Sequence, residues 1–220
     1  MLRACERDLP WWEIPTRGIL ALCPGRNSKH GTVDLARYPR AVPAENELFT
    51  VGWIGTPVTA KYVRLVESAL LELRKGGDLR VVLVGPSWVE LRGLTVELRT
   101  WSEETEATEI GSFDVGIMPL PDEPWERGKC GYKLIQYMAC SRPVVASPVG
   151  VNRRIVEEGV NGFLATTTED WIRGLATLRR DPPTRQRMGE AGRRKVEMEY
   201  CTQVTAPRLA ALLRSAAGRL

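Results

Sequence analysis

The chain has 220 residues, of which 43% are hydrophobic, so it can bury a sizeable core and is not expected to be mainly disordered. Its formal net charge is only +4, which is weaker than nucleic-acid-binding domains usually carry. No apolar run approaches the roughly 20 residues that span a bilayer. We therefore expect no nucleic-acid partner and no transmembrane segment. A small anionic ligand and peripheral contact with an anionic membrane both remain open.

In chain order, alternating strands and helices follow an irregular arm at residues 1–45, which is rich in proline and glycine. We expect, in order, strand 48–55, helix 59–77, strand 79–85, strand 95–101, helix 102–113, strand 113–120, helix 130–139, strand 143–147, a short helical piece 153–159, strand 162–165 and helices 168–180, 183–200 and 203–219. In the first helix Val63, Val66, Leu70 and Leu73 share one apolar stripe, and Gly76–Gly77 end it.

This alternation predicts an α/β fold, with a Rossmann-like parallel sheet covered by helices on both faces and a helical C-terminal tail. We expect a domain at 46–200 and a separate C-terminal helix at 201–220. Parallel sheets of this kind bind ligands beyond the carboxyl ends of their strands. The loops 55–59, 119–131 and 147–152 should lie at that edge.

The loop "RGKCGYK" (127–133) combines two glycines with three cations where a helix begins. Gly128 and Gly131 allow close backbone approach, the helix start leaves N–H groups unpaired, and Lys129 and Lys133 add positive charge. These features predict a phosphate site, in which Cys130 also lies. On this reading Gly131→Val should block the ligand and spare the fold. A solvated charged loop with glycines serving only a turn is the alternative.

Two further loops carry glycine at the same edge. In "GWIGTPVTAK", Gly55 and Thr56 follow a strand, Thr59 is placed to cap the next helix, and Lys61 lies in its first turn. In "SPVGVN", Gly150 adds a third turn. Together with the loop at 127–133 they suit a diphosphate, although Lys61 could also simply face solvent.

Standard nucleotide signatures are absent, since neither GxGxxG nor GxxxxGK[ST] occurs. The five cysteines are widely spaced, which argues against a disulfide framework or a structural zinc site and fits a reducing cytoplasm. The single histidine, His30, lies far along the chain from the 128–131 loop, which argues against a Ser-His-Asp or Cys-His mechanism. Asp122–Glu123 reads as a solvated acidic turn rather than a metal site, so no metal is expected. Cys130 lies at a helix start, which favours a thiolate, but no second residue supports a catalytic role for it.

From about Gly31 to the C-terminus, and most specifically at residues 113–165 and 49–70, the sequence resembles the C-terminal, donor-binding domain of GT-B glycosyltransferases of the large retaining family four. The stretch "GTVDLARYPR" (31–40) resembles the segment that joins the two domains in this family. The resemblance implies a nucleotide-diphosphate sugar as substrate and no cofactor. It places Gln136 and Trp101 at the ribose and base, and Val149 and Asn152 at the sugar. The family's two glutamates, eight positions apart, fall here on Gly128 and Gln136. Its basic pair falls near Trp53 and Lys61, and Lys129 with Lys133 can compensate.

The function that follows is that of a donor-binding half of a glycosyltransferase, which acts on an unidentified acceptor and carries no identified catalytic residue. The resemblance covers only the second of two GT-B domains, so a separate N-terminal acceptor domain is expected. The alternatives are a non-catalytic nucleotide-sugar-binding module that needs a partner, and a scaffold whose glycine loops are only turns. The expected location is the cytoplasm or the inner membrane face.

The chain also has apolar groups at both ends. The C-terminal helix carries a leucine-rich stripe that packs either on its own sheet or on another domain. In the second case Trp11–Trp12 would also be covered by that domain. The stripe consists of Leu209, Leu212, Leu213, Ala216 and Leu220.

Overall fold

The computed structural model describes residues 31–40, 46–77 and 79–217. Trp11, Trp12, His30, Cys5 and Cys23 lie outside these residues, as do Leu220 and the side chain of Ala216. The expectations placed on them therefore stay predictions.

The core of the domain is a six-stranded parallel sheet, which confirms the expected Rossmann-like α/β class. Its strands are β1 (Phe49–Ile54), β2 (Leu79–Val84), β3 (Val96–Arg99), β4 (Val115–Met118), β5 (Val144–Ala146) and β6 (Gly162–Leu164). Their spatial order is β3-β2-β1-β4-β5-β6. The order reverses between β1 and β4, and in such sheets a ligand crevice opens beyond the carboxyl ends of the strands at this point.

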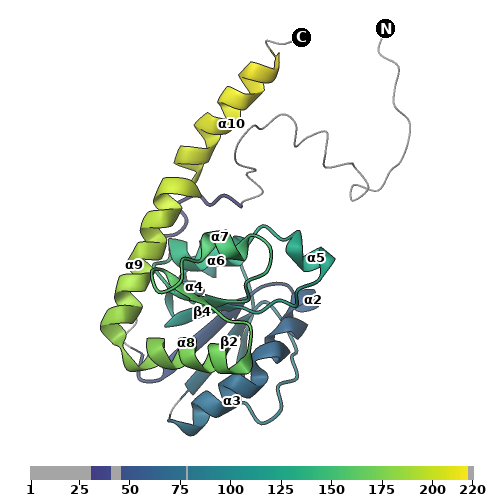
Figure 1. The fold of residues 1–220 in the computed structure, drawn as a ribbon, viewed down its shortest axis with the longest axis vertical. Helices are drawn as coiled ribbons and strands as arrows, with labels where there is room; N and C mark the ends of the chain where they lie inside the picture. Colours follow the sequence, from purple (N-terminus) through teal and green to yellow (C-terminus); the bar gives the residue numbers. More distant parts are fainter. Residues whose placement is uncertain (1–30, 41–45, 78, 218–220) are drawn as a thin grey trace, which may run out of the picture.

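Helices cover both faces of the sheet (Figure 1). One face packs against the 3₁₀ helix η1 (Lys61–Val66), α3 (Glu67–Lys75) and α8 (Thr168–Arg180). The other packs against α4 (Glu106–Gly111), α6 (Tyr132–Ala139) and α9 (Pro182–Glu199). Strand β1 serves both, since Val51 and Trp53 join the α3/α8 cluster and Ile54 joins the α6/α9 cluster.

The apolar stripes expected from the sequence face this core. Val63, Val66, Leu70 and Leu73 are all buried in the α3/α8 cluster. On α6, Leu134, Ile135 and Met138 are fully buried. Gly52 of β1 leaves space for the ring of Phe113, because a Cβ on this glycine would lie 2.1 Å from that ring. The buried side chains of α6 hold this helix on one face of the sheet, and its first residues line the cavity at the carboxyl ends of the strands.

The structure has two short helices that the sequence-based prediction missed or misplaced. Helix α2 (Pro57–Ala60) begins before Thr59, so the expected cap at Thr59 is wrong: Thr56 takes the N-cap position, and the Thr59 hydroxyl donates to its carbonyl over 3.0 Å. Helix α5 (Pro124–Arg127) lies within the segment read as a loop. Both start with proline, whose fixed φ suits the first helical position.

Segment 31–40, part of the expected irregular arm, is anchored to the domain. The Val33 backbone N–H donates to the Tyr200 carbonyl and its carbonyl accepts from Thr202 N–H, both over 3.0 Å. Val33 and Tyr38 are buried in the α6/α9 cluster. The Arg193 guanidinium on α9 donates to the Tyr38 carbonyl over 2.5 Å. The Tyr38 side chain is thereby held among residues of α4 and α6.

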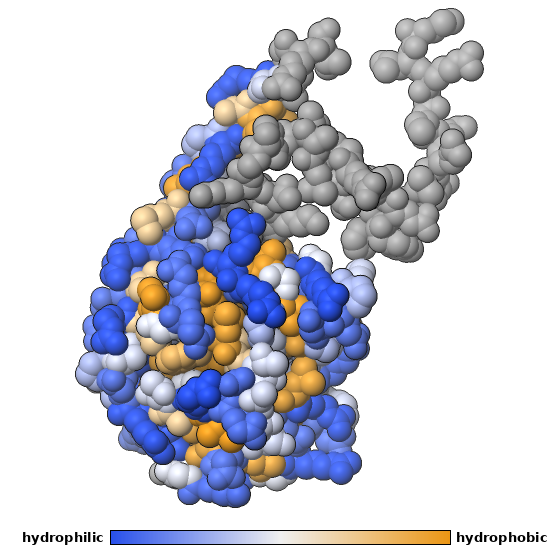
Figure 2. All heavy atoms as spheres, in the orientation of Figure 1, coloured by the Kyte–Doolittle hydropathy of each residue, from blue (hydrophilic) through white to orange (hydrophobic). Residues whose placement is uncertain are grey.

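The remaining helices are α7 (Asn152–Ile155), which starts one residue before the expected piece, and α10 (Thr202–Ala217). Helix α10 runs away from the body of the domain (Figure 1). Leu209, Leu212 and Leu213 are 57%, 43% and 61% exposed, so these leucines do not pack on the sheet. Figure 2 shows hydrophobic residues between hydrophilic ones along this helix. No helix of the described residues is long and apolar enough to cross a bilayer.

Candidate functional site

A cavity of about 660 Å³ lies at the carboxyl ends of the central strands. Ile54 ends β1 and Gly55 follows it, Met118 ends β4, and Gly85 follows β2, so the cavity opens at the point where the strand order reverses. This size is typical of a small-molecule site. The lining residues are Ile54, Gly55, Thr56, Pro57, Gly85, Trp101, Glu106, Met118, Gly128, Lys129, Cys130, Gly131, Tyr132, Lys133 and Gln136.

Two glycines bring the backbones of the β1 and β2 loops into contact on one side of the cavity. Gly85 has a φ of +110°, and a Cβ there would lie 2.1 Å from the Gly55 carbonyl oxygen. A Cβ on Gly55 would lie 2.6 Å from Cε of Lys133. Gly55 therefore leaves the space that the Lys133 side chain fills.

The N-terminus of α6 faces this cavity. Gly131 is the N-cap residue with a φ of +69°, and it lines the cavity together with Cys130, Tyr132 and Lys133. Within the described part of the chain, the backbone N–H groups of residues 130–133 donate no hydrogen bond. Unpaired N–H groups at the positive end of a helix favour an anion.

The Lys133 side chain is enclosed without a carboxylate partner among the described residues. Its Nζ lies 5.3 Å from the ring centroid of the buried Trp53, a cation–π contact. Burial, and to a smaller extent the neighbouring Lys129, lowers the Lys133 pKa to about 8. An anion in the cavity would offset both of these unfavourable effects.

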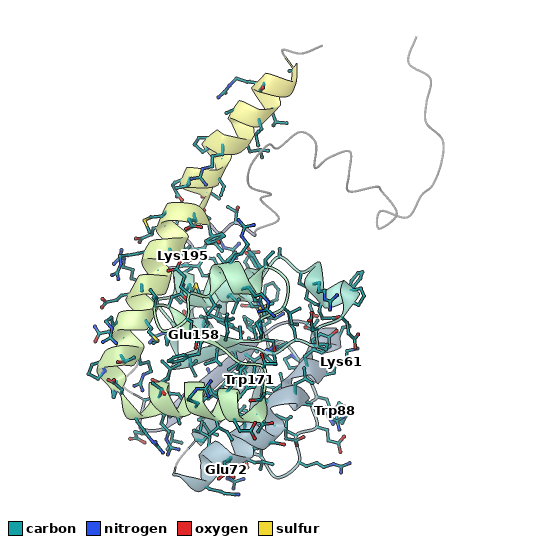
Figure 3. The ribbon with its side chains drawn as sticks, in the orientation of Figure 1. Lys61, Glu72, Trp88, Glu158, Trp171 and Lys195 are labelled. Carbon is teal, nitrogen blue, oxygen red and sulfur yellow. The ribbon has the colours of Figure 1, made fainter. Side chains whose placement is uncertain are left out.

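Lys129 and Lys61 both lie beside the ring of Tyr62, with Nζ 5.5 Å and 5.3 Å from its centroid. The Tyr62 hydroxyl donates to Glu126, and this bond raises the Tyr62 pKa to about 12. Lys129 lines the cavity, whereas Lys61 does not. The Lys61 side chain is exposed at the edge of the domain (Figure 3). The Arg127 guanidinium instead pairs with Asp122 over 2.7 Å.

A second polar group lies among the lining residues, around Glu106 of α4. The Trp101 indole N–H donates to Glu106 Oε2 over 2.7 Å, and the Tyr38 hydroxyl donates to Oε1. The Gln136 side-chain amide donates to the Tyr38 oxygen over 3.1 Å. Burial, followed by the bond to Glu106, raises the Tyr38 pKa above its usual value. Tyr38 therefore stays protonated and donates to the carboxylate.

The cavity brings together most of the residues predicted as phosphate, ribose and base contacts. Gly55, Thr56, Lys129, Cys130, Gly131, Lys133, Gln136 and Trp101 line it. The cavity is not lined by Lys61, Gly150, Val149 or Asn152. Among these, Val149 and Asn152 are buried, and the Asn152 amide donates to the Ser147 carbonyl over 3.0 Å.

The loop around Gly150 supports the first loop and does not line the cavity. Gly150 has a φ of +55°, and a Cβ there would lie 2.5 Å from the Arg127 carbonyl oxygen. The expectation that Gly131→Val would spare the fold is also wrong. A Cβ on Gly131 would lie 2.3 Å from Cδ1 of Ile155, in a backbone region that valine rarely adopts.

Sequence reasoning missed Glu106 and Tyr38. Glu106 lies four residues before Ile110, which is fully buried, and residues so spaced share one helix face. That spacing marks an inward-facing glutamate. Tyr38 had no local signal, because it reaches Gln136 across 98 positions of the sequence. No cluster of three metal-binding side chains occurs in the described ranges.

The fold is that of a Rossmann-like domain, and its cavity lies where the strand order of the sheet reverses. Residues 45–181 match the family described as "Glycosyl transferases group 1", and the chain belongs to this family. No curated protein sequence matches the chain. The six parallel strands and their helices are those of the C-terminal domain of a GT-B glycosyltransferase, as the resemblance implied.

Solved structures show the same fold. Sucrose-phosphate synthase from Thermosynechococcus elongatus has a TM-score of 0.64 at 19% identity, over 86% of this chain and 52% of that one. Anabaena Alr3699/HepE in complex with UDP-glucose has a TM-score of 0.66 at 17% identity, over 84% and 56%. The C-terminal domain of the group 1 protein LpcC from Francisella tularensis has a TM-score of 0.59 at 20% identity, over 77% and 98%. The chain thus spans about half of the two longer enzymes.

Proposed function

We propose that this chain binds a nucleoside-diphosphate sugar in the cavity and is the donor-binding half of a retaining glycosyltransferase. The observation that carries the proposal is the enclosed Lys133, without a carboxylate partner in the described residues, beside the unpaired N–H groups of α6. The family supports sugar transfer. The Anabaena relative with UDP-glucose makes a nucleotide sugar the first donor to test.

In the proposed reaction the bond between the anomeric carbon of the sugar and the diphosphate oxygen breaks, an acceptor hydroxyl oxygen bonds to that carbon, and the hydroxyl proton passes to the released diphosphate. The negative charge that develops on the diphosphate would be stabilised by Lys133, by Lys129 and by the start of α6. We assign no protein nucleophile, because Gly128 places no carboxylate at the position where the resemblance implied one. The acceptor and the hexose specificity are left unassigned.

The second candidate is a module that binds a nucleotide sugar and transfers nothing by itself. Gly128 favours it, since this residue lines the cavity without a side chain. In both cases we propose that an N-terminal acceptor domain, whether on the same polypeptide or a separate one, completes the site. We place the protein in the cytoplasm or, peripherally, at the inner membrane face.

Donor turnover separates the two candidates. The purified chain would be incubated with labelled UDP-, GDP- and ADP-sugars and a protein-free acceptor extract, and release of the nucleoside diphosphate would be followed. Release that the acceptor extract stimulates and Lys133→Ala abolishes identifies a transferase. Binding of a nucleotide sugar without release identifies the module, and absence of both contradicts the proposed function.

A further inference from the structure

We propose that the Glu106 carboxylate binds the ribose hydroxyls of the nucleotide, and that Tyr38 and Trp101 hold it in place for that contact. This inference rests on the proposed function of the cavity. It assigns a binding role to a residue of α4. The sequence motifs at 55–61, 127–136 and 149–152 lie outside this helix.

The chemistry of Glu106 fits a ligand that donates hydrogen bonds. An ionised carboxylate only accepts, and its two oxygens offer about four lone-pair sites. Tyr38 occupies one site on Oε1 and Trp101 one on Oε2. The side chain lines the cavity although it is only 7% exposed, so its free acceptor sites are available mainly to a bound ligand.

The position of Glu106 among the lining residues gives the cavity two unlike groups. Lys129, Lys133 and the start of α6 favour phosphate. A carboxylate repels phosphate and attracts hydroxyl groups, so Glu106 suits the uncharged nucleoside part of the same ligand. Gln136 joins the two groups, since it lies on α6 and donates to Tyr38, which in turn donates to Glu106.

Tyr38 and Trp101 are positioning residues in this scheme. They donate to different oxygens of Glu106 and thereby fix the plane of the carboxylate. Trp101 itself is 48% exposed and lines the cavity, so its ring can also lie against the base. Tyr38 comes from segment 31–40, which the Val33 backbone pairing and Arg193 hold against α9.

The test compares UDP, 2′-deoxy-UDP, 3′-deoxy-UDP and inorganic pyrophosphate on the full chain by calorimetry. We expect Glu106→Gln to weaken UDP binding by about 10-fold to 100-fold, which is the range typical of a lost hydrogen bond to a charged group. Pyrophosphate should bind as before or more tightly, because a negative charge has been removed. Both deoxy ligands should already bind wild type more weakly, and Glu106→Gln should weaken at least one of them less than it weakens UDP.

Controls separate a contact from a packing role. Glu103→Gln removes the same charge from a 63% exposed side chain and should change UDP affinity by less than about 2-fold. Tyr38→Phe and Trp101→Phe should each weaken UDP binding by about 3-fold to 10-fold and leave pyrophosphate binding unchanged. The effect is smaller than that of Glu106→Gln because the carboxylate remains and only its orientation is less fixed. Trp88→Phe, at an exposed tryptophan outside the lining, should change neither ligand.

Several outcomes would overturn the inference. The inference fails if Glu106→Gln weakens the binding of UDP and of pyrophosphate equally, or leaves UDP affinity unchanged. It also fails if the variant lowers the affinities for UDP and for both deoxy ligands by the same factor. In each of these cases wild type still binds UDP, so the proposed function stands. If wild type binds neither UDP, GDP nor ADP at millimolar concentration, the proposed function fails and the inference fails with it.

Discussion

The loops at 127–133 and 147–152 look alike in the sequence, since each places a glycine next to the start of a helix. In the structure they differ. Gly131 begins α6 at the cavity, whereas Gly150 packs on the Arg127 carbonyl and does not line it. A glycine that allows close backbone approach therefore says nothing about whether a ligand or another segment of the same protein makes the approach.

The largest expected effect comes from filling these glycine positions. Gly131→Val and Gly150→Val combine a positive φ with a Cβ overlap, and each should lower the free energy of unfolding by about 3 kcal/mol or more. Gly131→Val should in addition abolish nucleotide binding by any protein that still folds. Denaturant unfolding and calorimetry measure the two effects.

Gly159→Ala is the matched control for Gly150→Ala, the milder variant of the packed glycine. Gly159 has a φ of +74° but no heavy atom within 4 Å of the added Cβ, so only the backbone cost of about 1 kcal/mol should appear. Equal losses for Gly150→Ala and Gly159→Ala would contradict the packing role of Gly150.

The sheet and most of its helices follow from local patterns in the sequence. Continuous apolar runs predict buried parallel strands, and the stripe from Val63 to Leu73 predicts the helix that covers one face. The start of α6 and its two lysines could be placed at the ligand edge for the same reason. These features depend on neighbours in the sequence and on the general rule for parallel sheets.

The rest of the site depends on contacts between distant segments. Tyr38 meets Glu106 across 68 positions, and no period in segment 31–40 marks it. The burial of Asn152 follows from its bond to Ser147 in the folded loop. Lys61 comes after Gly55 in the sequence and Lys133 comes after Gly131. Only Lys133 is enclosed, because Gly55 leaves space for its side chain in the folded protein. Such differences arise only once the chain has folded.

The two lysines give the next prediction. Lys133→Ala should weaken nucleoside-diphosphate binding by about 10-fold to 100-fold, as expected for a lost charge-assisted hydrogen bond. Lys61→Ala should weaken it by less than about 3-fold, since the exposed Lys61 lies outside the cavity and salt screens its charge. Calorimetry on both variants measures the difference. Equal losses of affinity in the two variants would contradict the claim that the enclosed Lys133 binds the diphosphate and the exposed Lys61 does not.

A smaller effect should follow from pH. Burial lowers the Lys133 pKa to about 8 from an ordinary value of 10.5, so this lysine loses its charge in the folded protein as the pH rises through 8. Diphosphate affinity should therefore fall above pH 8, where the terminal phosphate is already fully ionised because it titrates near pH 6. In Lys133→Met that decline should be absent. A profile that stays flat from pH 7 to 10 in wild type would contradict the role of Lys133.

The lowered pKa of Lys133 also predicts how the stability of the unliganded protein depends on pH. Below pH 8 Lys133 is protonated in both the folded and the unfolded state, and its buried charge lowers stability in full. Between about pH 8 and 10.5 only the folded protein releases the proton, so this group's contribution to stability rises with pH. Denaturant unfolding of wild type and Lys133→Met across this window measures the difference. A wild-type curve parallel to that of the variant would contradict it.

The smallest effect is expected on α10. Leu213→Gln replaces a side chain that is 61% exposed, and it should change the free energy of unfolding by less than about 0.5 kcal/mol. Leu134→Ala in the core of α6 should cost about 2–5 kcal/mol by the same measurement. A loss above 1 kcal/mol for Leu213→Gln would show that α10 packs against the rest of this chain.

The most direct test of the donor site is a crystal structure of the chain with the nucleoside diphosphate that binds most tightly in calorimetry. Our account predicts the diphosphate against the backbone N–H groups of residues 130–133, with Lys133 Nζ within hydrogen-bond distance of a phosphate oxygen. A diphosphate bound outside the cavity, or inside it with the phosphates away from the start of α6, would contradict that account.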